Sequence, residues 1–128
     1  MSESIVFISN QRIKEGKAEG YKQSYRETVE LIKANKPGTV AHLAFFSEDD
    51  TEATIIHVFP NAAAMELHMQ GVGELAKKAY EFIEIVSFEI YGMPGDTVLE
   101  AMKKIAGSGV VMKIRPQAIG GYIRFKPG

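Results

Sequence analysis

The chain has 128 residues, of which 45% are hydrophobic and 24% charged, and its formal net charge is −1. These values fit one domain with a substantial core. They argue against a nucleic-acid binder, which needs a clustered excess of Lys and Arg. The chain contains no cysteine, which excludes disulfides, a thiolate nucleophile and a zinc–cysteine site. Met1–Ser4 lacks the basic start of a signal peptide, and no apolar run has membrane-spanning length. We therefore expect a cytoplasmic protein without nucleic-acid or membrane partners.

The first half of the chain is predicted to contain three strands and one helix. β-Branched and aromatic residues predict a strand over Ile5–Ile13. Apolar residues at spacings of three and four predict an amphipathic helix over Ala18–Ile32, which a Pro-Gly pair then ends. Two more strands, Thr39–Phe46 and Ala53–Phe59, flank a short polar turn. A turn of this length favours an antiparallel hairpin.

A second helix is predicted from Asn61 to about Glu84, loosened at Gly71 and Gly73. Asn61 reads as its N-cap, because a short amide side chain can accept from an N–H of the first turn. Ile85–Tyr91 is predicted as the fourth strand. The order strand, helix, strand, strand, helix, strand is the split β-α-β arrangement of a ferredoxin-like α+β fold. It has an antiparallel sheet with both helices on one face.

Residues 93–128 are predicted to extend this domain, which spans residues 1–92, rather than to form a second one. Thr97 and Glu100 fit a capping box, so a short helix is expected from Thr97 to about Ala106. Two short strands are expected over Val110–Ile114 and Tyr122–Phe125.

The predicted sheet is apolar on both faces. In the second strand, Val40, Ala44 and Phe46 alternate with Ala41, Leu43 and Phe45. Helices on one side can cover only one of these faces, and the other would be a large exposed apolar patch. A homodimer that packs sheet against sheet is the simplest cover.

His68 is the first candidate functional residue. It lies two turns into the second predicted helix, on the same face as Ala64, Leu67 and Leu75. A titratable ring in an apolar stripe can be a functional group, and it can equally be a core histidine with a satisfied hydrogen bond.

His42 and His57 form a second candidate group. A hairpin that turns at Asp49–Asp50 places His42 directly opposite His57. Such a pair can bind a metal, share a proton, or form a polar pair in a dimer interface or barrel interior. Two histidines without a carboxylate are a weak metal signal, since stable sites use three or four ligands. We therefore predict no metal site and assign both rings to ligand binding.

Polar groups near the end of the first strand form a third group. Asn10, Gln11 and Arg12 can hydrogen-bond a ligand oxygen or an enolate, or they can be solvated where the strand leaves the sheet. Tyr21 and Tyr25 lie on the sheet-facing stripe of the first helix, where packing with one hydroxyl partner is expected. We place Tyr25 with the ligand-binding residues.

The segment Thr54–Phe59, the sequence Asn61-Ala62-Ala63-Ala64-Met65-Glu66-Leu67-His68 and the strand Ile85–Tyr91 together resemble the antibiotic biosynthesis monooxygenase domain family. In that family the second helix opens with an acidic or Asn cap, followed by Ala at the fourth position and His at the eighth. The resemblance covers residues 5–91. It implies a dimeric α+β barrel with a ligand cavity between sheet and helices. Haem-degrading members use a Trp, and this chain has none, so haem degradation is not expected.

The resemblance implies a cofactor-free monooxygenase that acts on a small phenol or enol. His68 would then be the base or proton shuttle, and Asn10 and Arg12 would donate hydrogen bonds to the oxyanion. One alternative is a non-catalytic ligand-binding or stress-related barrel with structural histidines. A further alternative is an isomerase or lyase that uses His68 on a small carbonyl compound.

Overall fold

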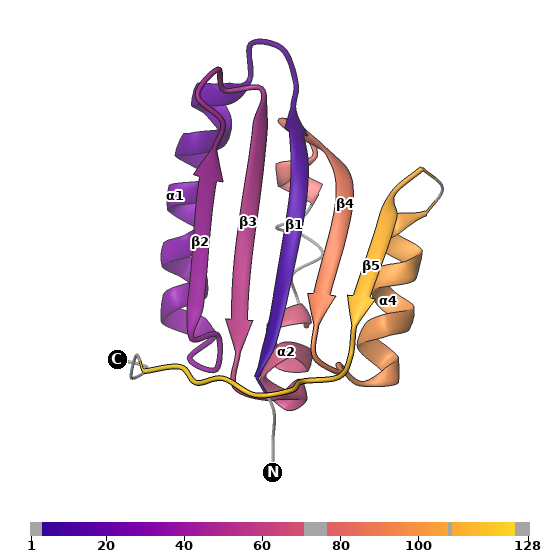
Figure 1. The fold of residues 1–128 in the computed structure, drawn as a ribbon. Coiled ribbons are helices and arrows are strands. Elements are labelled where there is room, and N and C mark those ends of the chain that lie inside the picture. The colour runs from indigo at the N-terminus through magenta and orange to yellow at the C-terminus, as the bar shows by residue number, and fades with distance from the viewer. Residues whose placement is uncertain (1–3, 71–76, 108, 125–128) are drawn as a thin grey trace.

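Five strands form one sheet in the computed structural model, which describes residues 4–70, 77–107 and 109–124. The strands lie in the order β2-β3-β1-β4-β5 (Figure 1). Their bounds are β1 Ile5–Ile13, β2 Ala41–Phe46, β3 Glu52–Phe59, β4 Ile83–Tyr91 and β5 Val111–Arg115. Neighbouring strands pair antiparallel, except for β4 and β5, which pair parallel. The first four strands have the predicted ferredoxin-like order, and β5 extends the sheet beyond β4.

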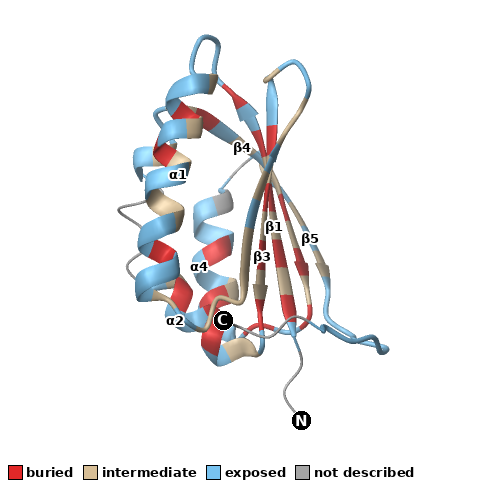
Figure 2. Ribbon diagram, turned by 90° about the vertical axis from the view of Figure 1, so that its left-hand side faces the viewer, coloured by how far each residue is buried: buried red, intermediate tan, exposed pale blue. Residues whose placement is uncertain are grey.

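The helices α1 (Ala18–Asn35), α2 (Ala62–Met69) and α4 (Asp96–Ala106) all cover the same face of the sheet (Figure 2). This confirms the predicted layer arrangement. Val98 and Met102 of α4 are buried in one cluster with Met65 of α2 and with Phe59 and Ile90 of the sheet. The segment after residue 92 thus shares the main apolar core.

Alternation along β1 decides which side chains meet the helices. The odd-numbered residues Ile5, Phe7, Ser9, Gln11 and Ile13 are buried, while the even-numbered ones are less buried and face the other side. We call the side covered by helices the inner face and the opposite side the outer face. The pairing of β1 with β4 shifts between Asn10 and Gln11, which leaves Val86 as an extra residue in a β-bulge.

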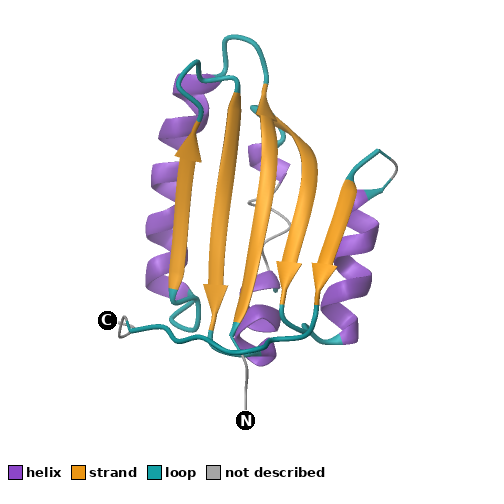
Figure 3. Cartoon of the chain, in the orientation of Figure 1, coloured by secondary structure: helices purple, strands orange, loops and turns teal. Residues whose placement is uncertain are grey.

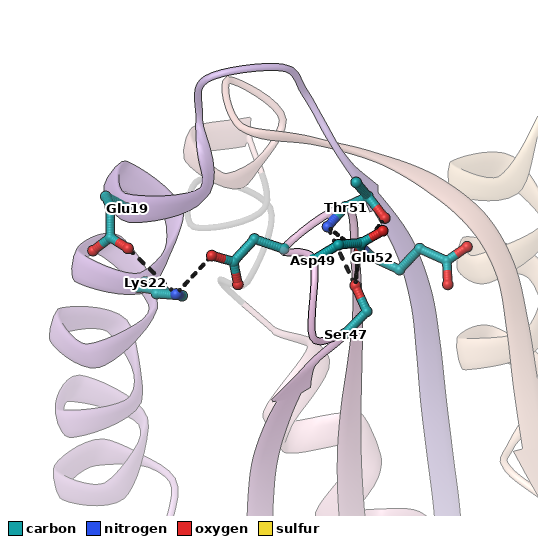
Figure 4. A network of polar contacts seen from close by, with 7 residues as sticks. Glu19, Lys22, Ser47, Asp49, Thr51 and Glu52 are labelled. Atoms are coloured by element: carbon teal, nitrogen blue, oxygen red, sulfur yellow. Dashed lines mark hydrogen bonds and ion pairs between the residues drawn. The ribbon is translucent and has the colours of Figure 1, made fainter.

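The hairpin between β2 and β3 has the predicted register, with His42 opposite His57. Its turn is held by Asp49, whose Oδ1 accepts from the Thr51 amide at 3.1 Å and from the Ser47 hydroxyl at 2.9 Å (Figure 4). Lys22 of α1 pairs with Asp50 at 3.2 Å. The tip of the hairpin is therefore tied to the helix layer, and the register of β2 is well defined.

The second helix is shorter than predicted. Asn61 caps α2 as expected, accepting from the Ala64 amide at 2.8 Å. However, α2 ends at Met69, where Gln70 is extended with ψ 127°, and the described chain is helical again over residues 77–79, within the predicted range. Gly71 and Gly73 lie outside the described residues. Ile83 and Glu84, expected at the helix end, instead pair with β1 and begin β4, since strand pairing there outweighs local helical periodicity.

The C-terminal part also differs from the prediction. The helix α4 begins at Asp96 with Gly95 as its cap, so Thr97 is not an N-cap. The strand expected over Tyr122–Phe125 is absent from residues 122–124, and Phe125 lies outside the described residues (Figure 3). Tyr122 is 81% exposed and follows a pair of glycines. Among the described residues, no strand of the sheet pairs with residues 122–124, and a strand without such pairing is not stable.

No helix in the described part of the chain is long and apolar enough to cross a membrane.

Gly92→Ala is expected to lower the free energy of unfolding by about 2 kcal/mol or more. Gly92 has φ +111°, and a Cβ there would lie 2.9 Å from the backbone oxygen of Ser4. Chemical denaturation measures the effect. Gly120→Ala is the control, because a Cβ added there would meet no atom within 4 Å. Equal midpoints for the two variants would contradict the expectation.

Candidate functional site

A cavity of about 160 Å³ lies between α1 and the inner face of the sheet. Apolar side chains form much of its wall, among them Phe7, Ile55 and Phe88. The polar groups that reach it come from β1, α1, β2, β3 and α2, and they include all three histidines of the chain. An apolar cavity of about 150 Å³ accommodates a benzene molecule. The volume therefore suits a ligand with one small ring.

The three histidines form a cluster at one end of the cavity. Cross-strand pairing brings His42 and His57 together, with ring centroids 4.5 Å apart. His68 reaches them from α2, and its ring centroid lies 5.4 Å from that of His57 and 5.9 Å from that of His42. One nitrogen of each ring lies within 4.8 Å of the others. The sequence predicted the pair, but only the packing of α2 on the sheet adds the third ring.

Each ring is oriented by a hydrogen bond at Nδ1. His57 Nδ1 donates to the Phe7 carbonyl at 3.0 Å, which leaves Nε2 with its lone pair. His68 Nδ1 bonds the Thr39 hydroxyl and His42 Nδ1 bonds the Tyr25 hydroxyl, each at 2.8 Å. Among the described residues, no partner is found for the Nε2 atoms.

Each Nε2 atom consequently has open space beside it. No fully buried side-chain nitrogen or oxygen in the described part of the chain lacks a partner, so an unpartnered Nε2 must have open space beside it. All three rings line the cavity. They therefore offer three convergent nitrogen lone pairs or N–H groups to whatever enters.

Burial keeps these rings neutral. It lowers the pKa of His42 to about 4. Burial also lowers the pKa of His68 to about 4, with further contributions from His42 and Lys36. The pKa of His57 lies well below its usual range because of burial and then because of His42. At neutral pH the cluster is a set of uncharged imidazoles, able to accept a proton or to ligate an ion.

A second polar group lies along the same cavity. The Tyr21 hydroxyl donates to Gln11 Oε1, and Gln11 Nε2 donates to the Ser9 hydroxyl at 3.1 Å. Burial raises the pKa of Tyr21 and of Tyr25 to about 12. Both phenols therefore stay protonated. The Tyr21 proton is already donated to Gln11, whereas the Tyr25 hydroxyl can donate to a ligand when it accepts a hydrogen bond from Nδ1 of His42.

The structure does not bring Asn10 and Arg12 to this cavity. Both lie on the outer face of β1, opposite the histidines. Asn10 Nδ2 donates to Ser87 Oγ at 3.0 Å and to Glu89 Oε2 at 2.7 Å. Arg12 forms an exposed ion pair with Glu84. His68, His42, His57 and Tyr25 are thus assembled in one place, and the two predicted oxyanion donors are not among them.

Two residues of the site were missed by the sequence reasoning. Ser9 and Thr39 give no motif: Thr39 merely precedes β2, and its contact with His68 spans the fold. Ser9 lies two residues from Phe7 on the same face of β1, but the pattern of that strand does not show which face meets the helices.

Comparison with known proteins places the fold but not the activity. No family model and no curated protein matches the chain. Solved structures do match it. MupZ from Pseudomonas fluorescens has a TM-score of 0.70 at 18% identity, over 94% of this chain and 91% of its own. SnoaB, a cofactor-independent oxygenase from Streptomyces nogalater, has a TM-score of 0.61 at 15% identity, over 73% of this chain and 96% of its own.

A putative antibiotic biosynthesis monooxygenase from Caulobacter crescentus also matches, with a TM-score of 0.62 at 14% identity, over 70% of this chain and 88% of its own. The chain therefore has the fold of the antibiotic biosynthesis monooxygenases. The resemblance predicted from the sequence is therefore confirmed for the fold.

Proposed function

We propose that the protein is a cofactor-independent monooxygenase that acts on a small neutral phenol or enol in the histidine-lined cavity. The observation that carries the proposal is the convergence of three neutral imidazoles on a cavity of about 160 Å³, the size of one ring. Two further facts support it. The fold is shared with SnoaB, a cofactor-independent oxygenase, and the cavity holds both proton acceptors and protonated phenols.

His68 is assigned as the base. Its Nδ1 is fixed by Thr39, and Nε2 then takes the proton from the substrate hydroxyl. A pKa of about 4 makes the isolated ring a weak base. The substrate anion that forms beside it favours the imidazolium and raises that pKa. Tyr25 is placed to donate a hydrogen bond to the developing oxyanion.

The reaction balances without an added reductant. The substrate anion adds O₂ at a ring carbon that bears a hydrogen atom. This step forms a C–O bond and a peroxide anion. The peroxide takes the proton from His68. Nε2 of His68, neutral again, then removes the hydrogen of that carbon as a proton while the O–O bond breaks, and it passes this proton to the departing hydroxide. One oxygen atom becomes the new carbonyl and the other leaves as water. A phenol and O₂ thus give a quinone and water, and O₂ accepts all four electrons.

The test is oxygen uptake with a panel of neutral single-ring phenols and hydroquinones. We expect quinone formation and O₂ uptake in a 1:1 ratio, and a fall of about 10²–10⁴-fold in kcat for His68→Gln. Arg12→Gln is the matched control, since Arg12 lies on the outer face. Absence of turnover across the panel, together with unchanged phenol binding in His68→Gln, would overturn the proposal.

A non-catalytic ligand-binding barrel is the second candidate function. It is favoured by one observation: each ring already has a structural hydrogen bond at Nδ1. If the histidines are structural, His68→Gln lowers the thermal midpoint by several degrees and leaves phenol affinity unchanged.

We also propose that two copies of the chain associate through the outer face. Leu43 and Phe45 of β2 are 48% and 58% exposed there, and Val86 and Val111 are also exposed. Apolar side chains grouped on one sheet face mark an interaction surface. A second copy offers the same apolar surface, and two-fold packing would cover both.

A further inference from the structure

We infer that His42, His57 and His68 form a binding site for a divalent transition-metal ion of the zinc type, with the cavity as its open coordination position. Three nitrogen ligands within 4.8 Å of one another match the set of a catalytic zinc site, in which three protein ligands leave the fourth position to water or substrate. Sequence reasoning found only two of these ligands. The third comes from α2.

The hydrogen bonds around the cluster are those that a metal site requires. Metal-bound histidines usually use one ring nitrogen for the ion and donate the other N–H to a carboxylate, a backbone carbonyl or water, which fixes the ring. The Phe7 carbonyl is such an acceptor, and a hydroxyl oxygen can take the place of water. Here Phe7, Thr39 and Tyr25 hold the Nδ1 atoms. The three Nε2 atoms remain, on rings that line the cavity.

The geometry needs only a small adjustment. An ion at about 2.0–2.1 Å from each nitrogen in tetrahedral geometry would place the nitrogens about 3.3–3.4 Å apart. Starting from separations of at most 4.8 Å, the distances between the nitrogens must shorten by at most about 1.5 Å. His57 is fixed by its strand and its stacking on Phe7 at 4.6 Å. The adjustment therefore falls on His42 and His68.

The ligand chemistry selects among ions. Imidazole nitrogen suits zinc, cobalt, nickel and copper, whereas magnesium and calcium require oxygen ligands. No carboxylate is among the described residues that line the cavity. Hard cations are therefore excluded, and the first choice is Zn²⁺, for which tetrahedral geometry costs nothing.

Metal binding and proton transfer would use the same nitrogen atoms. An ion on the cluster occupies Nε2 of His68, so the ring can no longer take a proton. If the proposed function holds, on which this consequence rests, Zn²⁺ inhibits quinone formation and a chelator restores it. The metal site itself does not depend on that activity.

The test uses the full chain without an affinity tag, because a histidine tag binds the same ions. The protein is treated with EDTA and dialysed, and then titrated with CoCl₂ and with ZnCl₂. We expect the visible bands of four-coordinate Co²⁺, one Zn²⁺ per chain by calorimetry, and a rise in the thermal midpoint with Zn²⁺. His42→Gln and His68→Gln should each weaken Zn²⁺ binding by at least 100-fold, and Thr39→Ala by about 10–100-fold.

Tyr80→Phe is the matched control, since Tyr80 lines the cavity without touching the three rings, and it should bind Zn²⁺ as the parent chain does. Absence of Co²⁺ bands and of saturable Zn²⁺ binding in the parent chain would overturn the inference, as would equal affinity in the His→Gln variants. If the parent chain binds Zn²⁺ but its metal-free form oxidises no phenol, only the proposed function is overturned. Circular dichroism of each variant shows that it is folded.

Discussion

Acidification of the metal-free protein from pH 6.5 to 4.5 is expected to remove about 2–3 kcal/mol of stability for each of His42 and His68. Both rings have a folded-state pKa of about 4, against about 6.5 in an unfolded chain. The unfolded state therefore binds more protons throughout this window. The stability that neutral rings contribute is complete above pH 6.5 and is lost as the pH falls towards 4. The combined loss is comparable with the whole stability of a small domain.

Urea denaturation at several pH values in the presence of EDTA measures this slope. The carboxyl groups whose pKa is lowered, Asp49, Glu84 and Glu89, gain their protons below the window and contribute little inside it. The double variant His42→Gln, His68→Gln provides the comparison. Its stability should change much less between pH 6.5 and 4.5. A parent chain with the same shallow slope would show that the rings are solvated in the folded state.

Phe45→Glu is expected to raise the dissociation constant of the proposed dimer by about 10³-fold or more. Phe45 is 58% exposed on the outer face. In a two-fold interface each substitution occurs twice, and each buried carboxylate costs several kcal/mol to desolvate. Sedimentation equilibrium should give twice the 14.1 kDa of one chain for the parent protein and a single-chain mass for the variant.

Leu31→Glu is the matched control for this substitution. Leu31 is 53% exposed, a similar fraction, but it lies on α1 and not on the sheet. It should leave the mass unchanged. A parent chain that sediments at the mass of one chain at high micromolar concentration would rule out the dimer.

Local sequence signals predicted the parts of the site that depend on short-range geometry. The length of the turn fixed the pairing of His42 with His57, and the cap at Asn61 placed His68 two turns into α2. These signals act within a few residues, so one sequence is sufficient to read them.

The face of β1 could not be read in this way. Ile5 and Phe7 are as apolar as Val6 and Ile8, so the pattern does not show which set meets the helices. The choice depends on long-range pairing, in which Phe7 lies opposite His57. Once that register is known, the alternation of side chains along β1 assigns Gln11 to the cavity and Asn10 to the other face. Asn10 and Arg12, the predicted oxyanion donors, therefore lie on the outer face of β1, away from His68.

The cavity lining holds one further consequence. Among the described residues that form it there is no Lys, Arg, Asp or Glu, and the histidines are neutral. An anion that enters gives up its hydration shell and meets no positive charge, which costs several kcal/mol. The cavity therefore discriminates between ionisation states of a ligand. It binds a weak acid in its protonated form and excludes the conjugate base of the same compound.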